Sequence, residues 1–407
     1  MTNEILPGEV AAGPLAGVRV LELGTMIAGP VTGTLMADFG ADVIKIETPK
    51  VGDPIRQSGP FCGEESLYWV VEGRSKKSVT LDLRTKGGQQ VLRDLVQHVD
   101  VLVENFRPGT MKRWELDYER LKASNPRLVM LSISGFGQTG PYALRPAYDR
   151  IALAFSGFLN MTGFPDRPPV RPGTAIADYQ GALFGAFAVM MALYYRDVGK
   201  GSGQHIDLSL YESIFRFTDV MIAAYDKLGL GRERQGNAHF AASPGDHYET
   251  SDGRFLALTV ASNSVFQRLC EAMDQPQLAN DPRFATHIKR VENYQTINGI
   301  VASWVKSTSL PAVVTALEAQ SVPHSLIYSP ADIMADPHYA ARDSIVTVDH
   351  PVIGPVKMPG VTPRFSVSKP PAIRPAPPLG RDTHEVLAHL LGMSRADIAK
   401  LQEAGTI

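Results

Sequence analysis

Short runs of aliphatic and β-branched residues recur between residues 17 and 135, and most are followed by a segment long enough to form a helix. The runs predict strands at 18–23, 42–47, 78–83, 101–104 and 127–132. Strands that alternate with helices are typical of βαβ units. We therefore predict an α/β fold with a parallel, doubly wound sheet.

The ends of these predicted strands indicate where a ligand binds, because ligands of open parallel sheets bind outside the carboxyl ends of the strands. Glycine and polar residues collect at those ends, in the segments 24–29, 48–56, 105–109 and 135–140. We expect the functional site to be built from these four segments.

The pattern changes after residue 173. It predicts a long helix at 179–196, a strand at 205–210, and then a second unit from about 226 to 330. That unit has short strands at 247–250 and 254–260 around the turn at 251–253, and helices near 264–274, 294–306 and 310–320. Nine prolines between 351 and 380 indicate a mostly extended segment, and a helix at 383–391 follows it.

Length, charge and cysteine content limit the classes of protein to which this chain is expected to belong. A chain of 407 residues is expected to form two domains. A net charge of −2 gives no general attraction to nucleic acid or to a membrane surface. Cys62 and Cys270 have no metal-binding or disulfide spacing, so we expect a cytoplasmic protein without a metal site. No signal peptide or membrane span is expected, and the apolar stretch 181–195 is interpreted as a buried helix.

The segment 135–140, GFGQTG, has the glycine spacing of a dinucleotide-binding loop. It follows the fifth predicted strand rather than the first, and Pro141 and Pro146 interrupt any helix after it. We interpret it as a glycine-rich loop that lines a ligand. A pyridine-nucleotide oxidoreductase remains an alternative that rests on this motif alone.

Two groups of cationic side chains lie near predicted strand ends. They are Arg74, Lys76, Lys77 and Arg84 in the first group, and Arg107, Lys112 and Arg113 in the second. Either group alone is typical of a solvated surface. Together they are suited to a phosphorylated adenine nucleotide, because Arg and Lys bind phosphate.

Asp178 precedes the long apolar helix and has two interpretations. Aspartate is favoured as an N-cap, where its carboxylate accepts helix N–H bonds. Small residues at 177, 181 and 185 would let another backbone approach this helix closely. A carboxylate held on such a rigid element beside a narrow passage is also suited to act as a nucleophile.

The chain resembles the class III CoA-transferases from residue 14 to residue 407. The resemblance rests on motifs that occur in the family's order: LAGVRVLEL (15–23), GADVIKIE (40–47), VENFRPG (103–109), SGFGQTGPY (134–142), Ala177-Asp178, GSGQHID (201–207) and LYES (210–213).

The resemblance implies an interlocked-ring homodimer. Each chain would have a Rossmann-like large domain formed by residues 1–225 and 331–407, and a smaller α+β domain at 226–330. Asp178 aligns with the family's nucleophile, which forms an acyl anhydride and then an aspartyl-CoA thioester. The implied partners are an acyl-CoA and a carboxylic acid. Coenzyme A takes part as a portion of the substrate, and no permanently bound cofactor is implied.

By position, the resemblance also implies the residues that contact CoA. They are Ile27, Ala28, Thr48, Leu81, Arg84, Asn105, Phe106, Arg107, Arg113, Arg145 and Tyr148.

The chain departs from two related enzymes at sites that affect chemistry. Formyl-CoA transferase has a catalytic glutamine at the position of Ile27, and its glycine-rich lid corresponds here only to Ser243-Pro-Gly245. The family's α-methylacyl-CoA racemases have a His-Asp pair where this chain has Tyr148-Asp149, and tyrosine is a poor substitute for histidine as an acid or base at neutral pH. Racemisation is therefore a disfavoured alternative, and the retained Asp178 disfavours a non-catalytic CoA-binding protein.

The segments 211–216, 233–236 and 247–250 most resemble members that use succinyl-CoA and small dicarboxylic acids. A second substrate carboxylate needs a cation or N–H donors in a closed site. Arg216 is our first candidate, because the adjacent Phe215 and Phe217 suggest partial burial. Ser243 and Gly245 are further candidates for the acid's site. Arg232 and Arg234 are weaker, since both flank Glu233.

Overall fold

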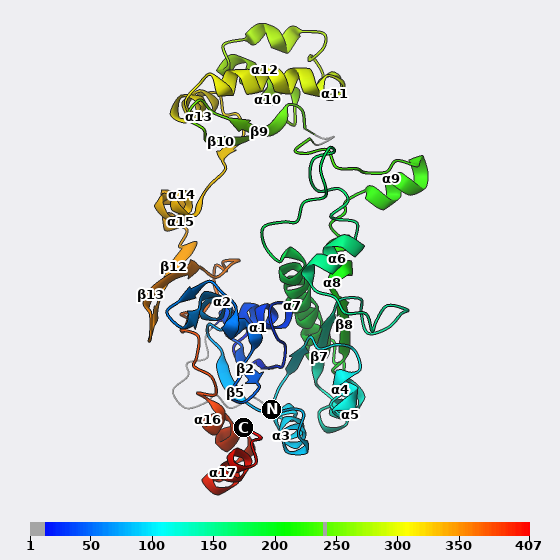
Figure 1. Cartoon of the computed structure of the whole chain (residues 1–407), viewed down its shortest axis with the longest axis vertical. Coiled ribbons are helices and arrows are strands. Elements are labelled where there is room, and N and C mark those ends of the chain that lie inside the picture. The colour runs from blue at the N-terminus through cyan, green and yellow to red at the C-terminus, as the bar shows by residue number, and fades with distance from the viewer. Residues whose placement is uncertain (1–12, 239–241) are drawn as a thin grey trace. The chain divides into compact units, whose positions relative to one another are not determined.

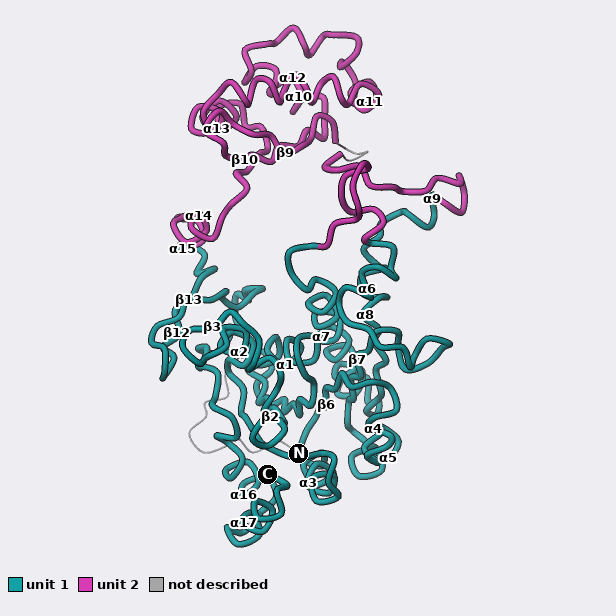
Figure 2. The backbone as a smooth tube through the Cα atoms, in the orientation of Figure 1, with its two compact units in different colours: residues 1–158, 172–224, 340–407 teal, residues 159–171, 225–339 magenta. Residues whose placement is uncertain are grey.

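The computed structural model describes residues 13–238 and 242–407, and these form two compact units (Figure 2). Unit 1 comprises the described residues of Met1–Phe158, Pro172–Ala224 and Ala340–Ile407. Unit 2 comprises the described residues of Leu159–Arg171 and Tyr225–Tyr339. Residues 159–171 thus belong to unit 2, although they lie within the range that we expected for the large domain.

Unit 1 is built on a six-stranded parallel sheet with the strand order β5-β2-β1-β6-β7-β8, which confirms the predicted fold class (Figure 1). The strands are β1 (Arg19–Glu22), β2 (Asp42–Glu47), β5 (Lys77–Thr80), β6 (Val101–Glu104), β7 (Val129–Ser134) and β8 (His205–Ser209). The direction of strand addition reverses between β1 and β6. In doubly wound sheets this reversal opens a crevice at the carboxyl ends of the two strands.

Helices α1 (Ala28–Asp38) and α7 (Ile176–Asp197) pack on each other and on the sheet. We predicted that the small residues of α7 admit another backbone. Helix α1 packs on this part of α7, where Thr32 Oγ1 donates to the Ala182 carbonyl at 3.4 Å, and side chains fill the remaining space. A Cβ atom on Gly181 would lie 2.6 Å from Leu210 Cδ2, and one on Gly185 would lie 2.8 Å from Leu131 Cδ2. The small residues therefore let α7 pack closely against side chains of β7, of α1 and of the segment after β8.

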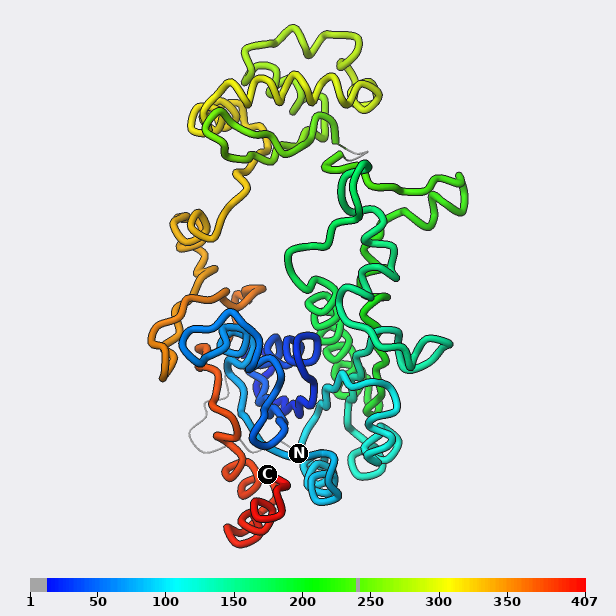
Figure 3. Tube along the Cα trace, in the orientation of Figure 1, coloured from blue at the N-terminus to red at the C-terminus, as the bar shows by residue number. Residues whose placement is uncertain are grey.

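A second helical layer includes α3 (Lys86–Val96), α5 (Tyr118–Ser124) and α16 (Thr383–Leu391), whose apolar residues share one core with the strands. The C-terminal segment joins this layer beside β5 (Figure 3). The Ser78 amide donates to the Asp382 carboxylate at 2.7 Å, and the Thr80 amide donates to Thr383 Oγ1 at 3.0 Å. The C-terminal segment of the described chain therefore packs on the core of unit 1.

Helix α7 is less buried than we predicted. Phe187 is 58% exposed and Tyr194 is 68% exposed, so the expectation of a buried helix at 181–195 is wrong for the single chain. By length and composition alone, α7 is the one helix in the described part of the chain that is able to span a membrane. Core helices of soluble proteins meet the same criteria, so this finding is weak evidence for a span.

Unit 2 is the α+β part of the chain. Its antiparallel sheet has the order β11-β10-β9, formed by β9 (Gly245–Glu249), β10 (Phe255–Thr259) and β11 (His324–Leu326). The apolar residues of β9 and β10 share a core with α10 (Asn263–Ala272), α12 (Tyr294–Lys306) and α13 (Leu310–Ala319).

Shorter elements complete the two units. They are η1 (Pro54–Gln57), β3 (Phe61–Cys62), β4 (Glu65–Ser66), α2 (Leu67–Glu72), α4 (Thr110–Arg113), α6 (Asp149–Phe155), α8 (Leu210–Phe215), α9 (Met221–Leu228), η2 (Pro276–Asn280), α11 (His287–Glu292), α14 (Pro330–Ala335), α15 (Pro337–Ala341), β12 (Ile345–His350), β13 (Gly354–Pro359) and α17 (Arg395–Glu403).

Candidate active site

A cavity of about 670 Å³ lies at the carboxyl edge of the parallel sheet in unit 1. The loops after β1, β6 and β7 and the first turn of α7 contribute to its wall. The lining residues are Thr25, Met26, Ile27, Ala28, Pro54, Asn105, Phe106, Arg107, Pro108, Ile133, Ser134, Gly135, Arg145, Pro146, Ala147, Tyr148, Asp178 and Leu210. The cavity thus occupies the crevice that the strand order creates.

Asn105 joins the two loops of this crevice. Its Oδ1 accepts from the Thr25 amide at 2.8 Å, and its Nδ2 donates to the Thr25 carbonyl at 2.9 Å. The side chain therefore uses both its acceptor and its donor to fix the spacing of the loops after β1 and β6.

Met26 lies in the loop after β1 with a φ of 66°, a left-handed conformation that is uncommon for a residue with a side chain. Its amide donates to Asp53 Oδ1 at 3.0 Å, and Asp53 Oδ2 pairs with the Lys45 ammonium at 2.7 Å. Lys45 also pairs with Glu22 at 3.0 Å and donates to the Gly24 carbonyl. A buried ion-pair network therefore supports this wall of the cavity.

Lys45 is fully buried, yet it keeps its charge. Burial alone would lower the pKa of its ammonium, but the carboxylates of Asp53, Glu22 and Glu47 raise that pKa above its usual value. The charge is therefore a fixed part of the site at any physiological pH.

The structure corrects both interpretations for three of the four side chains in the first cationic group. Arg74, Lys76 and Lys77 are buried, and they pair with Asp38 at 2.6 Å, Glu22 at 2.8 Å and Asp42 at 2.8 Å, respectively. These three side chains therefore form neither a solvated surface nor a phosphate site.

Asp178 occupies the third position of α7, so the N-cap interpretation is wrong. The N-cap is Ala175, which makes no side-chain capping bond. The Asp178 carboxylate is half-buried at the cavity wall. Burial, followed by the negative charge of Asp149, raises its pKa to about 7. A carboxylate that titrates near neutrality in a cavity is typical of a functional group.

Two hydrogen bonds hold the residues on either side of Asp178. The Ala177 amide donates to Asp149 Oδ1 at 2.8 Å, and the Tyr179 hydroxyl donates to Glu72 Oε1 at 3.1 Å. Asp149 begins α6 and Glu72 ends α2, so two separate elements fix the first turn of α7.

A second cavity of about 410 Å³ adjoins the first and shares Thr25, Pro54 and Phe106 with it. Its wall includes Leu81 and Arg84 after β5. The Arg84 side chain is 69% exposed and pairs with Asp82 at 2.8 Å. The two cavities together follow the carboxyl edge of the sheet.

Nearly all residues predicted to contact CoA line these two cavities. The first contains Ile27, Ala28, Asn105, Phe106, Arg107, Arg145 and Tyr148, and the second contains Thr48, Leu81, Arg84 and Phe106. Arg113 is exposed, lines neither cavity, and donates to Thr110 Oγ1 at 3.2 Å.

Three residues that support the walls of the site were not among the predicted site residues. Lys45 gave a signal, since it is a charged residue inside the apolar run DVIKIE of β2. Asp53 gave none, and Asp149 was noted only beside Tyr148 at the position of the racemases' His-Asp pair, because each acts on a residue at least 27 positions away in sequence, Met26 and Ala177 respectively.

The residues predicted to hold the acid lie in different units. Arg216 caps α8 in unit 1 and is exposed; Phe215 and Phe217 are 41% and 48% exposed, so the expected partial burial is wrong. Ser243 in unit 2 is fully buried. Its hydroxyl donates to the Arg290 carbonyl at 2.9 Å, and Arg290 Nε donates back to the Ser243 carbonyl at 2.7 Å.

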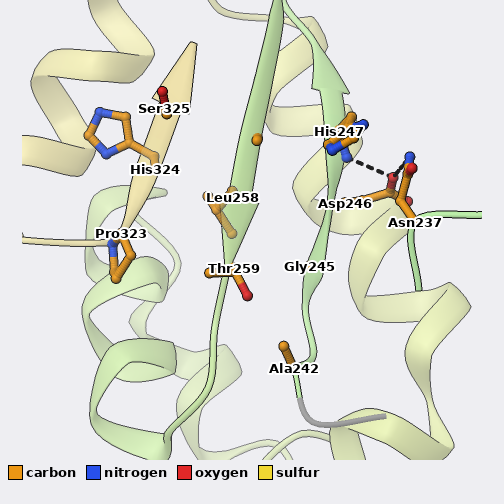
Figure 4. Close-up of a pocket in the computed structure, with 11 residues that line it drawn as sticks. Asn237, Ala242, Gly245, Asp246, His247, Leu258, Thr259, Pro323, His324 and Ser325 are labelled. Carbon is orange, nitrogen blue, oxygen red and sulfur yellow. Dashed lines mark hydrogen bonds between the residues drawn. The ribbon is translucent and has the colours of Figure 1, made fainter. Parts of the chain in front are cut away.

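Gly245 begins β9 and lines a pocket of about 440 Å³ within unit 2 (Figure 4). Figure 4 shows Asp246 and His247 of β9 on one side of β10, and His324 and Ser325 of β11 on the other. The Asp246 carboxylate accepts from Asn237 Nδ2 and from the His247 amide, each at 2.7 Å. The segment aligned with the lid of formyl-CoA transferase is therefore hydrogen-bonded within unit 2.

The GFGQTG segment follows β7 and does not open a helix. Gly137 and Gly140 have φ values of 86° and 90°, and a Cβ on Gly135 would lie 2.3 Å from the Cβ of Ala147. Turns and irregular backbone continue until α6 begins at Asp149. The glycines thus serve turns and close packing, and the strand–turn–helix context of a dinucleotide-binding loop is missing.

Within residues 13–238 and 242–407, no group of three or more His, Cys, Asp or Glu side chains is arranged to hold a metal ion. Cys62 is exposed and Cys270 is buried, and both are free thiols.

The fold and the site thus define an α/β protein with two adjoining cavities, cationic side chains and a nucleophile-like carboxylate. The family model "CoA-transferase family III" matches residues 15–383, so the chain belongs to this family and is an enzyme of the class III CoA-transferase type. It is 42% identical to succinyl-CoA–D-citramalate CoA-transferase of Chloroflexus aurantiacus over 96% of this chain and 97% of that protein.

Two further comparisons agree with this assignment. The chain is 40% identical to the beta subunit of succinyl-CoA–L-malate CoA-transferase of Chloroflexus aurantiacus, over 99% of this chain and 100% of that subunit. The crystal structure of a CaiB/BaiF family protein from Brucella suis matches with a TM-score of 0.83 and 35% identity, over 93% of this chain and 100% of that one.

Proposed function

We propose that this enzyme transfers CoA from succinyl-CoA to a small dicarboxylic acid through an aspartyl-CoA thioester on Asp178. The observation that carries the proposal is the position of Asp178, in one cavity with the cationic side chains Arg107 and Arg145. An acyl-CoA has anionic phosphates at one end and a thioester at the other, and the two adjoining cavities offer cations and a carboxylate to match.

The chemistry requires only the carboxylate and the two substrates. An Asp178 oxygen attacks the thioester carbonyl, the C–S bond breaks, and an anhydride and a CoA thiolate form. The thiolate attacks the Asp178 carbonyl carbon of that anhydride, which releases the donor acid and leaves the aspartyl-CoA thioester. The acceptor carboxylate then attacks this thioester, and the released thiolate attacks the acceptor carbonyl to give the new acyl-CoA and free Asp178.

The names of the two relatives support the substrate class. They act with succinyl-CoA on D-citramalate and on L-malate. Both acids carry two carboxylates and a hydroxyl group. We infer that the acceptor here is an acid of this kind, with Arg216 as a candidate cation for its second carboxylate.

Exchange between succinyl-CoA and a panel of free acids tests the proposal. Malate, citramalate, itaconate, mesaconate, glutarate and acetate are each incubated with the enzyme, and the new CoA esters are identified by mass spectrometry. We expect transfer to the dicarboxylic acids and little to acetate. Equal transfer to acetate would refute the dicarboxylate assignment, and inversion of a 2-methylacyl-CoA without exchange would favour the racemase alternative.

The raised pKa of Asp178 predicts a pH dependence. The carboxylate is the nucleophilic form, so kcat/KM for the acyl-CoA is expected to fall as the pH drops through about 7. In Asp149→Asn the amide oxygen is still able to accept from the Ala177 amide, but the negative charge is lost. The acidic limb of kcat/KM should therefore move to lower pH, while burial keeps it above the ordinary value of 3.8. An unmoved limb would exclude Asp149 as a cause of the shift.

We also propose that the enzyme is a cytoplasmic homodimer and that α7 contributes to its interface. The helix has a row of apolar side chains that are 40–68% exposed: Leu183, Phe187, Met190, Met191 and Tyr194. A contiguous apolar surface of this kind is typical of an interaction site.

Phe187→Asp is therefore expected to convert the dimer into monomers, because a carboxylate in an apolar interface would be desolvated without a partner. Light scattering after gel filtration at micromolar concentration measures the mass. Val367→Asp is the matched control, since Val367 is 90% exposed and distant from α7 in sequence. A wild-type mass for the Phe187 variant would exclude this face as the interface.

A further inference from the structure

Ser134 is a buried residue of the cavity whose hydroxyl group has no internal role. It ends β7, lines the cavity with Asp178, and is 7% exposed. Its Oγ atom has no hydrogen-bond partner among the residues that the structure describes. The adjacent strand offers a contrast. Ser209, the register partner of Ser134 on β8, is fully buried, and its hydroxyl both donates to the Glu212 carboxylate and accepts from the Glu212 amide.

A buried hydroxyl without a partner is unfavourable, because it has lost its hydrogen bonds to water and gained none. Most buried polar side-chain atoms in native proteins are hydrogen-bonded for this reason, so an exception requires an explanation. Ser134 lies in the wall of the candidate active site, but its Oγ atom is enclosed in the ligand-free chain. A ligand that fills the cavity supplies the missing partner once the serine side chain rotates toward it.

The packing of α7 places Ser134 near the reacting end of the cavity. Gly181 lies one helical turn after Asp178 and contacts the Leu210 side chain. Leu210 directly follows Ser209, the partner of Ser134 in the sheet. Leu210, Ser134 and Asp178 all line the same cavity.

We propose that Ser134 is a substrate-binding residue whose hydroxyl donates a hydrogen bond to a carbonyl oxygen in the acyl-pantetheine arm of the acyl-CoA. This inference rests on the proposed CoA-transfer function. A neutral donor suits an uncharged carbonyl, whereas Arg107 and Arg145 suit the phosphates. The arm carries two kinds of carbonyl, those of its amides and that of the thioester.

Ser134→Ala tests the proposal through stability and activity together. Because the variant removes a hydroxyl that lacks a partner in the free protein, we expect the ligand-free melting temperature to rise by about 2 °C. The increase in melting temperature caused by CoA or succinyl-CoA should become smaller. The kcat/KM for succinyl-CoA should fall roughly tenfold, because the loss of one hydrogen bond in the transition state has an effect of this size. Ser209→Ala is the matched control, since it removes a satisfied hydroxyl. It should lower the melting temperature of the ligand-free protein and leave the ligand-induced increase unchanged.

The choice of ligand identifies the carbonyl. Free CoA has the amide carbonyls but no thioester, so a smaller melting-temperature increase with both CoA and succinyl-CoA assigns Ser134 to an amide. A smaller increase with succinyl-CoA alone assigns it to the thioester. If both increases and kcat/KM stay at wild-type values, the proposal is overturned, whatever the variant's own melting temperature. These binding measurements need no turnover, so an enzyme that binds CoA but transfers none would refute the proposed function separately.

Discussion

Asp178→Ala is expected to reduce CoA transfer by about 10³-fold or more, because no other group in the proposed mechanism forms the covalent intermediate. The measurement is the rate of new CoA-ester formation from succinyl-CoA and a dicarboxylic acid. Intact-protein mass spectrometry of the wild type with acyl-CoA should show a CoA adduct that hydroxylamine removes, and the variant should show none.

A control at the other end of the same helix separates chemistry from folding. Asp197 ends α7 and pairs with Arg196 at 2.7 Å, so Asp197→Ala should keep nearly full activity. Substantial transfer by the Asp178 variant would contradict the mechanism, whereas an equal loss in both variants would indicate a general effect on α7.

The stability of the Asp178 variant gives a second, independent measurement. The folded-state pKa of about 7 lies above the ordinary value of 3.8, so folding favours the protonated form. The contribution of Asp178 to the stability of the wild type is therefore largest below pH 4. This contribution is lost as the pH rises through 7. Asp178→Asn removes this term, so the variant should melt at a higher temperature than the wild type at pH 8 and show no such advantage at pH 4.

Lys45→Met is expected to destabilise the protein by about 3 kcal/mol or more, since it leaves the buried carboxylate of Asp53 without a cation and Glu22 with Lys76 alone. This corresponds to a fall in melting temperature of roughly 6–12 °C. The loop that contains Met26 depends on Asp53, so the KM for the acyl-CoA should also rise.

The control for this prediction is an exposed ion pair. Lys86 is 79% exposed and pairs with Glu115 at 3.0 Å, so Lys86→Met should leave the melting temperature close to that of the wild type, because solvent screens an exposed ion pair. Adding Asp53→Asn to the Lys45 variant should restore part of the stability, because it removes one uncompensated charge. A Lys45 variant that melts like the wild type would contradict the role assigned to the network.

Local sequence pattern determined the type and order of the main elements. The bounds of β2, β6 and α16 agree with the predicted segments 42–47, 101–104 and 383–391. The same pattern indicated that the strand ends form the site, and residue motifs marked Asp178. These features depend on burial, propensity and turn residues within a short stretch of chain, which the sequence carries directly.

Only the tertiary structure showed which residues interact with each charged side chain. The sequence pattern alone did not reveal that Arg74, Lys76 and Lys77 form buried ion pairs, because their partner carboxylates lie 35 or more residues away in sequence. It also did not place Asp149 beside the first turn of α7, or β1 next to β6, where the crevice opens. The sequence shows that a residue is charged, but it does not show whether the side chain contacts water, a phosphate or a buried carboxylate. Only the packing of distant segments sets its surroundings, and with them the pKa of Asp178 and the shape of the cavity that it lines.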